Sequence, residues 1–132
     1  MNQKLVIFDL DGTLAESKQP LSWKMSGLLE RLLESTRLAI ISGGALEQFL
    51  KQVVGQLGHS AKVSNLYLLP TCGAALYEFH NGGWDKVYEE RLSEREAHEI
   101  EAALKVAATE TDIIDFTEQA YGERVEYRGG QV

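Results

Sequence analysis

Residues 4–13 read KLVIFDLDGT, and this stretch decides the fold. Its first half, Lys4 to Phe8, is a short, continuous apolar run rich in β-branched residues. Such a run is typical of a central strand of a parallel sheet, buried on both faces. Its second half, Asp9 to Thr13, interrupts the pattern with two carboxylates and a glycine. We therefore expect a buried strand that leads directly into a polar loop.

Helix and strand patterns alternate along the next 60 or so residues. A helix is expected from Ser22, because leucines then recur at helical spacing. A second apolar strand is expected at Arg37–Ile41, a second helix from about Ala45 to Leu57, and a third strand at Leu66–Leu69. Strands and helices that alternate at this spacing form βαβ units with a parallel sheet. The fold class is therefore α/β, with a Rossmann-like core.

The pattern changes near Thr71. Two strands, Ala75–Phe79 and Trp84–Glu89, flank the glycine-rich turn HNGG, which predicts a β-hairpin. The residues Ser93 and Glu96 form a capping-box pattern, so a helix is expected from there to about Ala108.

The C-terminal residues predict one further hairpin. Gly122–Tyr127 has the pattern of a strand, residues 128–130 that of a turn, and residues 131–132 that of a returning strand. We expect residues 1–78 to form the core and residues 79–132 a second α/β domain that is incomplete at its C-terminus.

Composition restricts the classes of function. The 132 residues carry a formal net charge of −7, which argues against a nucleic-acid partner. The single cysteine, Cys72, excludes an intrachain disulfide and favours a reducing compartment. No apolar run has the length of a signal peptide or of a membrane span. We therefore predict a cytoplasmic protein with neither a nucleic-acid nor a membrane partner.

The end of the first strand is the candidate site. Side chains two residues apart on an extended segment point the same way, so Asp9 and Asp11 present two carboxylates on one side. A hard cation such as Mg²⁺ prefers such oxygen ligands and offsets their repulsion. Gly12 lets the backbone approach a phosphate closely. Ser42 offers a hydroxyl at the end of the second strand, and Gly43 with its neighbour offers amides before a helix.

Three other interpretations concern the same residue types. The two carboxylates alone are equally typical of a capped turn after a strand. An EF-hand calcium loop is excluded because it needs an oxygen ligand and then Gly where Thr13 and Leu14 stand. A zinc site is not expected, because the three histidines lie near no Cys or paired carboxylate.

The stretch FDLDGTL, from Phe8 to Leu14, resembles the first motif of the haloacid dehalogenase-like superfamily. The segment Ile40 to Gly43 is similar to its second motif. The resemblance implies that Asp9 is the nucleophile that attacks phosphorus, and that Asp11 is the general acid and base. It also implies Mg²⁺ bound by the Asp9 carboxylate and the Asp11 main-chain carbonyl, with a phosphate held near Gly12, Ser42 and Gly43.

A narrower resemblance, to the phosphomannomutase branch, covers nearly the whole chain. The segment EYRGG (residues 126–130) is similar to a family segment that places a phosphate-binding arginine at Arg128. A second family arginine falls on Lys18, which keeps the charge and loses the bidentate fork. The Asn-Gly that follows the third strand of that family reads Cys72-Gly73 here. The resemblance implies that Lys18 and Arg128 bind a sugar phosphate.

The superfamily also uses a lysine and a further acidic pair beyond the second domain, and residues 1–132 offer no substitute. Asp112 and Asp115 fall in the wrong region. We therefore expect this chain alone to be inactive, and to pair with a second copy or with a C-terminal half. The expected activity of a complete form is phosphomannomutase-like phosphoryl transfer. The alternatives are a sugar-phosphate phosphatase, and a non-catalytic chain that binds a phosphate ligand or a partner.

Overall fold

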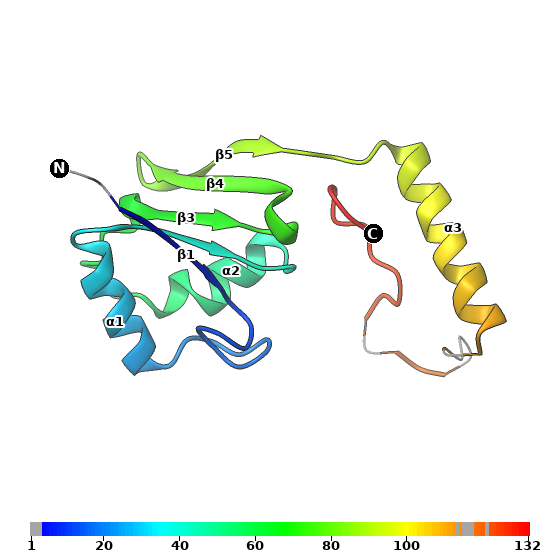
Figure 1. Cartoon of the computed structure of the whole chain (residues 1–132), viewed down its shortest axis with the longest axis horizontal. Helices are drawn as coiled ribbons and strands as arrows, with labels where there is room; N and C mark the ends of the chain where they lie inside the picture. The colour runs from blue at the N-terminus through cyan, green and yellow to red at the C-terminus, as the bar shows by residue number, and fades with distance from the viewer. Residues whose placement is uncertain (1–3, 113, 115–117, 121) are drawn as a thin grey trace. The chain divides into compact units, whose positions relative to one another are not determined.

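The computed structural model describes residues 4–112, 114, 118–120 and 122–132 (Figure 1). The chain divides into two compact units, Met1–Glu89 and Glu90–Val132. The first unit contains every strand that the described residues form.

The first unit is built on a five-stranded sheet with the order β1-β2-β3-β4-β5. Its parallel half consists of β1 (Leu5–Asp9), β2 (Arg37–Ile41) and β3 (Leu66–Leu69). Its antiparallel half is the predicted hairpin, β4 (Ala75–His80) and β5 (Gly83–Glu89). The sheet is therefore mixed, and the fold is α/β as predicted.

The hairpin continues the core sheet, because β4 pairs with β3. Its turn residues Asn81 and Gly82 have φ values of 48° and 84°, as a type I′ turn requires. The domain boundary expected between residues 78 and 79 falls within β4, whereas the two compact units meet between Glu89 and Glu90.

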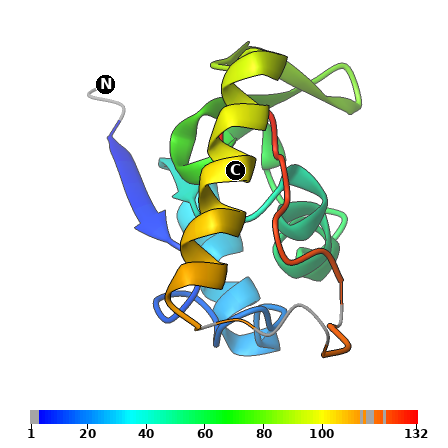
Figure 2. The ribbon, with the colours of Figure 1, turned by 90° about the vertical axis from the view of Figure 1, so that its right-hand side faces the viewer.

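Two helices cover one face of this sheet (Figure 2). These are α1 (Trp23–Leu33) and α2 (Leu46–Gln52), which supply apolar side chains to the same core. Alternate residues of β2 and β3 point into that core. The completely buried side chains there are Leu33, Leu38, Phe49, Val53, Leu66, Leu68, Leu10 and Ile40.

The burial of β1 differs from the prediction. Val6 and Phe8 pack against the core, but Leu5 and Ile7 are 55% and 57% exposed. The expectation that this strand is buried on both faces is therefore wrong for the described residues. The cause is its position, since among the described residues β1 pairs only with β2, and both helices contribute to the core on the Val6 and Phe8 side.

The helix boundaries follow local chemistry. α1 begins as predicted, with the Ser22 side chain accepting a hydrogen bond from the Met25 amide. α2 ends at Gln52 and a short 3₁₀ turn, η1 (Val54–Gln56), follows, so the helix is shorter than expected. The consecutive residues Val53, Val54 and Gly55 have low helix propensity, and Val53 already leaves ideal helical geometry with φ −111° and ψ −69°. A second 3₁₀ turn, η2 (Val63–Asn65), precedes β3.

The second unit contains α3 (Glu94–Glu110). The predicted capping box is confirmed: the Ser93 hydroxyl accepts from the Glu96 amide, and the Glu96 carboxylate accepts from the Ser93 amide at 2.9 Å. The hydrogen bond from the Ser93 side chain lowers the pKa of Glu96 below its ordinary value. None of the helices among the described residues is both long enough and apolar enough to cross a bilayer.

The described residues 122–132 form no strand, so the predicted C-terminal hairpin is wrong. The main-chain groups of this segment bond elsewhere. The Arg128 amide donates to the Gln131 carbonyl at 2.9 Å, and the Gly129 carbonyl accepts from Leu92 at 2.8 Å. The Tyr127 hydroxyl also donates to the Leu92 carbonyl. A turn and a contact with the start of the unit take the place of a strand ladder.

Candidate active site

The candidate site lies where the parallel strands end. Asp9 is the last residue of β1 and pairs in register with Ile41, which pairs in turn with Leu69. Ser42 follows directly and is buried, whereas Asp9 is exposed. In open α/β sheets ligands bind at this carboxyl edge. The structure therefore brings Asp9 and Ser42 to one edge, as the sequence predicted.

The loop after β1 is closed by a single carbonyl. The Leu10 carbonyl accepts hydrogen bonds from the amides of Thr13, Leu14 and Ala15, at 3.3, 3.0 and 3.2 Å. The Leu10 side chain is completely buried. A buried Leu10 directs the residues on either side of it away from the core.

The backbone conformation at position 12 requires glycine. Its φ is +79°, and its amide donates to the Ala15 carbonyl at 2.7 Å. An L side chain is strained at this φ. The space where a Cβ would stand is open, so the turn geometry by itself accounts for glycine at this position.

Each carboxylate accepts a hydrogen bond from the loop that follows β1. The Thr13 hydroxyl donates to Asp9 Oδ2 at 3.4 Å. The Lys18 main-chain amide donates to Asp11 Oδ1 at 3.0 Å. The sequence interpretation assigned a role to neither donor. Thr13 was detectable in principle as part of D-x-D-G-T, but the Lys18 amide follows from the path of the loop and leaves no signal in the sequence.

The segment after β3 forms hydrogen bonds with the loop Ser42–Gly44, which follows β2. The Thr71 amide donates to the Gly44 carbonyl and the Cys72 amide to the Ser42 carbonyl, both at 2.9 Å. The Ser42 amide donates to the Leu69 carbonyl at 3.3 Å. These three bonds fix the main chain around Gly43, which the sequence placed at the phosphate. A Cβ on Gly43 would lie 3.5 Å from the Cys72 sulfur, so the thiol borders this loop.

This arrangement requires an unusual backbone. Thr71, Cys72 and Gly73 have consecutive positive φ values of 51°, 56° and 85°. For residues other than glycine the left-handed region costs about 1–2 kcal/mol, and Asn tolerates it best. The Asn-Gly of the resembled family therefore suits this turn better than Cys72-Gly73.

We expect Cys72→Asn to stabilise the protein by about 0.5–1 kcal/mol, because Asn adopts positive φ at lower cost. Urea unfolding measures the effect. Cys72→Ala is the matched control, since it removes the thiol and leaves the backbone strain. An Asn variant no more stable than the Ala variant would show that strain at this position is not limiting.

The oxygen donors of the site fit part of a magnesium shell. Asp9 supplies an exposed carboxylate, and none of the loop hydrogen bonds among the described residues ends on the Asp11 carbonyl. Mg²⁺ takes one or two carboxylates and keeps several waters. The described part of the chain holds no group of three or more His, Cys, Asp or Glu arranged around a common point. Asp9 and Asp11 could therefore hold the ion with solvent completing the shell.

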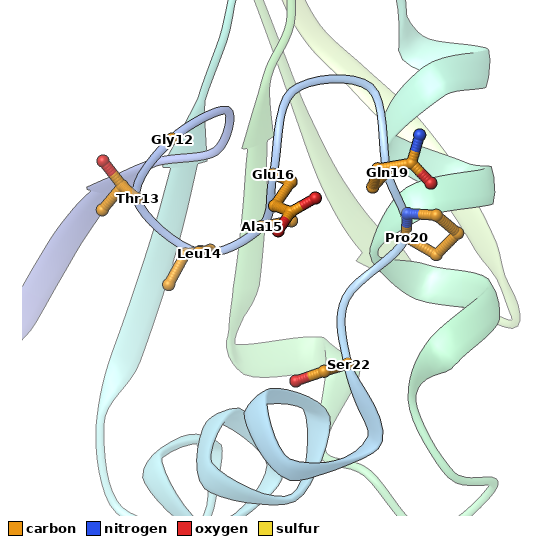
Figure 3. Close-up of a pocket in the computed structure, with 8 residues that line it drawn as sticks. All are labelled: Gly12, Thr13, Leu14, Ala15, Glu16, Gln19, Pro20 and Ser22. Carbon is orange, nitrogen blue, oxygen red and sulfur yellow. The ribbon is translucent and has the colours of Figure 1, made fainter.

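An open pocket of about 540 Å³ adjoins the loop after β1 (Figure 3). Thr13, whose hydroxyl contacts Asp9, is one of its lining residues, whereas Asp9 and Asp11 do not line it. The lining residues are Gly12, Thr13, Leu14, Ala15, Glu16, Gln19, Pro20 and Ser22.

The two predicted substrate-binding cations lie in different units. Lys18 lies in the loop of the first unit and is exposed. Arg128 lies in the second unit, where its guanidinium is 2.8 Å from the Glu126 carboxylate. This hydrogen bond raises the pKa of Arg128 and lowers that of Glu126 relative to their ordinary values. Asp112 follows α3 in the second unit, and Asp115 lies outside the described residues.

Comparison with solved structures defines the class of fold. The chain is similar to a haloacid dehalogenase-like hydrolase from B. subtilis, with a TM-score of 0.64 and 19% identity over 80% of this chain and 34% of that one. It is also similar to the IMP-nucleotidase of Plasmodium falciparum, with a TM-score of 0.63 and 16% identity over 83% of this chain and 35% of that one. No protein-family model matches the sequence.

The chain thus spans about a third of the length of these structures. Over the part that it spans, it has the fold of haloacid dehalogenase-like hydrolases, as its first motif led us to expect.

Proposed function

We propose that this chain carries the nucleophilic half of a Mg²⁺-dependent phosphoryl-transfer site that acts on a sugar phosphate. Asp9 is the phosphoryl acceptor and Asp11 the general acid and base. The observation that carries the proposal is the presence of two carboxylates at and just after the end of β1, each of which accepts a hydrogen bond from the following loop. The buried Ser42 follows the neighbouring strand β2 at the same edge of the sheet.

The proposed chemistry assigns one step to each group. The Thr13 hydroxyl contacts Asp9 Oδ2, which leaves Oδ1 to attack phosphorus as the bond to the leaving oxygen breaks. Asp11 donates a proton to that oxygen. In the second half, Asp11 takes a proton from the acceptor hydroxyl, whose oxygen attacks the phosphoaspartate and releases Asp9. A carboxylate nucleophile thereby divides one difficult transfer into two easier ones.

Positive charge is needed at the phosphate, because catalysis of phosphoryl transfer is mostly positioning and charge neutralisation. Bound Mg²⁺ would supply that neutralisation from the Asp9 carboxylate and the Asp11 carbonyl. Gly12, Ser42 and Gly43 would surround the phosphate. Lys18 and Arg128 are proposed to bind the part of the substrate that does not react.

The group that finally accepts the phosphoryl group distinguishes two possible activities. A second hydroxyl of the sugar phosphate makes the protein a phosphomannomutase-like mutase, whereas water makes it a phosphatase. The names of the similar structures, a hydrolase and a nucleotidase, favour considering the phosphatase. Location in the cytoplasm stays a prediction, as does a non-catalytic chain that binds a phosphate ligand.

The deciding experiment, like the other turnover assays below, uses a complete form of the protein, for which the activity is proposed. This form is incubated with mannose 1-phosphate and millimolar Mg²⁺. Formation of mannose 6-phosphate supports the mutase, and release of inorganic phosphate supports the phosphatase. Neither product, or products formed equally by the Asp9→Asn variant, would contradict the proposed function.

We expect Arg128→Ala to raise KM for a sugar phosphate about tenfold or more, and KM for a small aryl phosphate far less, because Arg128 is proposed to bind the part of the sugar phosphate that does not react. Hydrogen bonds to charged groups are worth about 1.5–3 kcal/mol, which sets this magnitude. The matched control is Arg95→Ala, which removes an arginine whose side chain is 85% exposed on α3. Equal changes for both substrates would show that Arg128 is a surface charge.

A further inference from the structure

Lys18 has a backbone conformation that lysine rarely adopts. Its φ is +57°, and it is the third residue of the turn Glu16–Gln19, which the Gln19 amide closes on the Glu16 carbonyl at 2.9 Å. Turns with positive φ at the third position favour Gly or Asn there. Residues with strained backbone conformations cluster at functional sites, so the strain at Lys18 suggests a functional role for this turn.

This turn directs the Lys18 amide at the proposed acid and base. The amide donates to Asp11 Oδ1 at 3.0 Å, across seven residues of chain. The orientation of an amide is set by the backbone on either side of it. A turn without positive φ at Lys18 would therefore point this amide elsewhere.

The rest of the loop is fixed at both ends. Near its start, the Gly12 amide donates to the Ala15 carbonyl and Leu14 is buried. Near its end, the Leu21 amide donates to the Gln52 carbonyl at 2.9 Å and the Leu21 side chain is buried. Two anchored ends hold the intervening turn against Asp11.

We propose that Lys18 is a positioning residue that acts through its main-chain amide, whatever its ammonium binds. The amide fixes the Asp11 carboxylate through Oδ1, so that Oδ2 is the oxygen that carries the transferred proton. The inference rests on the proposed role of Asp11 and assigns to Lys18 a role in proton transfer that needs no lysine side chain.

Three variants separate the main chain from the side chain. Lys18→Gly, Lys18→Ala and Lys18→Val all lack the ammonium group. Gly accepts positive φ freely, Ala accepts it at a cost, and β-branched Val opposes it most strongly. A main-chain role predicts the order Gly, Ala, Val, whereas a side-chain role predicts three equal variants.

The first measurement needs no activity. Nuclear magnetic resonance of the ¹⁵N,¹³C-labelled chain detects coupling across the hydrogen bond from the residue 18 amide to the Asp11 carboxylate carbon. We expect this coupling in the wild-type protein and in Lys18→Gly, and its loss in Lys18→Val. Unchanged resonances of the buried Leu14 and Leu21 verify the fold, and Lys18→Thr replaces Lys18→Val if that variant misfolds. Absence of the coupling in the wild-type protein, or its persistence in both β-branched variants, would overturn the inference.

The second measurement compares leaving groups. A misplaced general acid slows substrates whose leaving oxygen needs a proton, and a positioned one contributes about 10²–10⁴-fold. Sugar-phosphate turnover by Lys18→Gly should exceed that by Lys18→Val at least about tenfold, with the two nearly equal on an activated aryl phosphate. Equal ratios for both substrates would mean a purely structural turn. Turnover in no variant would contradict the proposed function, and the coupling alone would then decide whether Lys18 positions Asp11.

Discussion

Asp9→Asn is expected to lower phosphoryl-transfer turnover by several orders of magnitude. A neutral amide is a poor nucleophile, so no phosphoaspartate forms and neither half of the reaction proceeds. The substitution is nearly isosteric, and the amide oxygen can still accept the hydrogen bond that Thr13 donates to Oδ2. The loss should therefore appear in kcat with little change in stability. Turnover of mannose 1-phosphate and unfolding in urea measure the two quantities.

The matched control is Asp85→Asn, which neutralises an exposed carboxylate on β5. It removes the same charge from the same unit and should leave turnover within about twofold of wild type, as surface substitutions usually do. Brief exposure to a ³²P-labelled substrate gives a second readout, because wild type should retain label sensitive to hydroxylamine and Asp9→Asn should not. An Asp9→Asn variant that kept a large fraction of wild-type turnover would exclude Asp9 as the nucleophile.

Asp11→Asn should slow turnover of a sugar phosphate about 10²–10⁴-fold, the usual contribution of a positioned acid or base. Its effect should depend on the leaving group. A sugar oxygen needs a proton as it departs, whereas the oxygen of an activated aryl phosphate departs without one. The ratio of kcat values for the two substrates measures this dependence.

The amide oxygen of Asn can accept the hydrogen bond from the Lys18 amide, so the loop should keep its path. The control is Asp112→Asn, at the end of α3 in the second unit. Equal impairment of Asp11→Asn with both substrates would show that the residue orders the site without transferring a proton.

The elements that the sequence predicted correctly carry local signals. β2 and β3 were predicted at their observed bounds. Short apolar runs bounded by polar or glycine-rich residues are typical of buried strands in an α/β fold. The starts of α1 and α3 were predicted from Ser22 and Ser93, whose side chains satisfy the first amides of each helix. The β4–β5 turn was predicted from the glycine-rich segment HNGG, in which Asn81 and Gly82 have positive φ.

Elements that depend on distant partners were predicted less well. β1 has the apolar pattern of a strand buried on both faces, yet which faces are covered depends on the packing of α1 and α2 and on what lies beside its free edge. The segment 122–127 has the pattern of a strand, but a strand exists only with a hydrogen-bonded neighbour. Neither condition can be read from the segment itself.

The candidate site, like the fold, was predicted only in part from the sequence. The sequence by itself predicted that Asp9 and Ser42 lie at one sheet edge, because the carboxyl ends of neighbouring parallel strands lie at the same edge. Only the tertiary structure decided which donors hold the site residues: the Lys18 amide on Asp11, and the amides of Thr71 and Cys72 on the Ser42–Gly44 loop. A main-chain amide is common to every residue except proline, so its role is set by where the folded chain aims it.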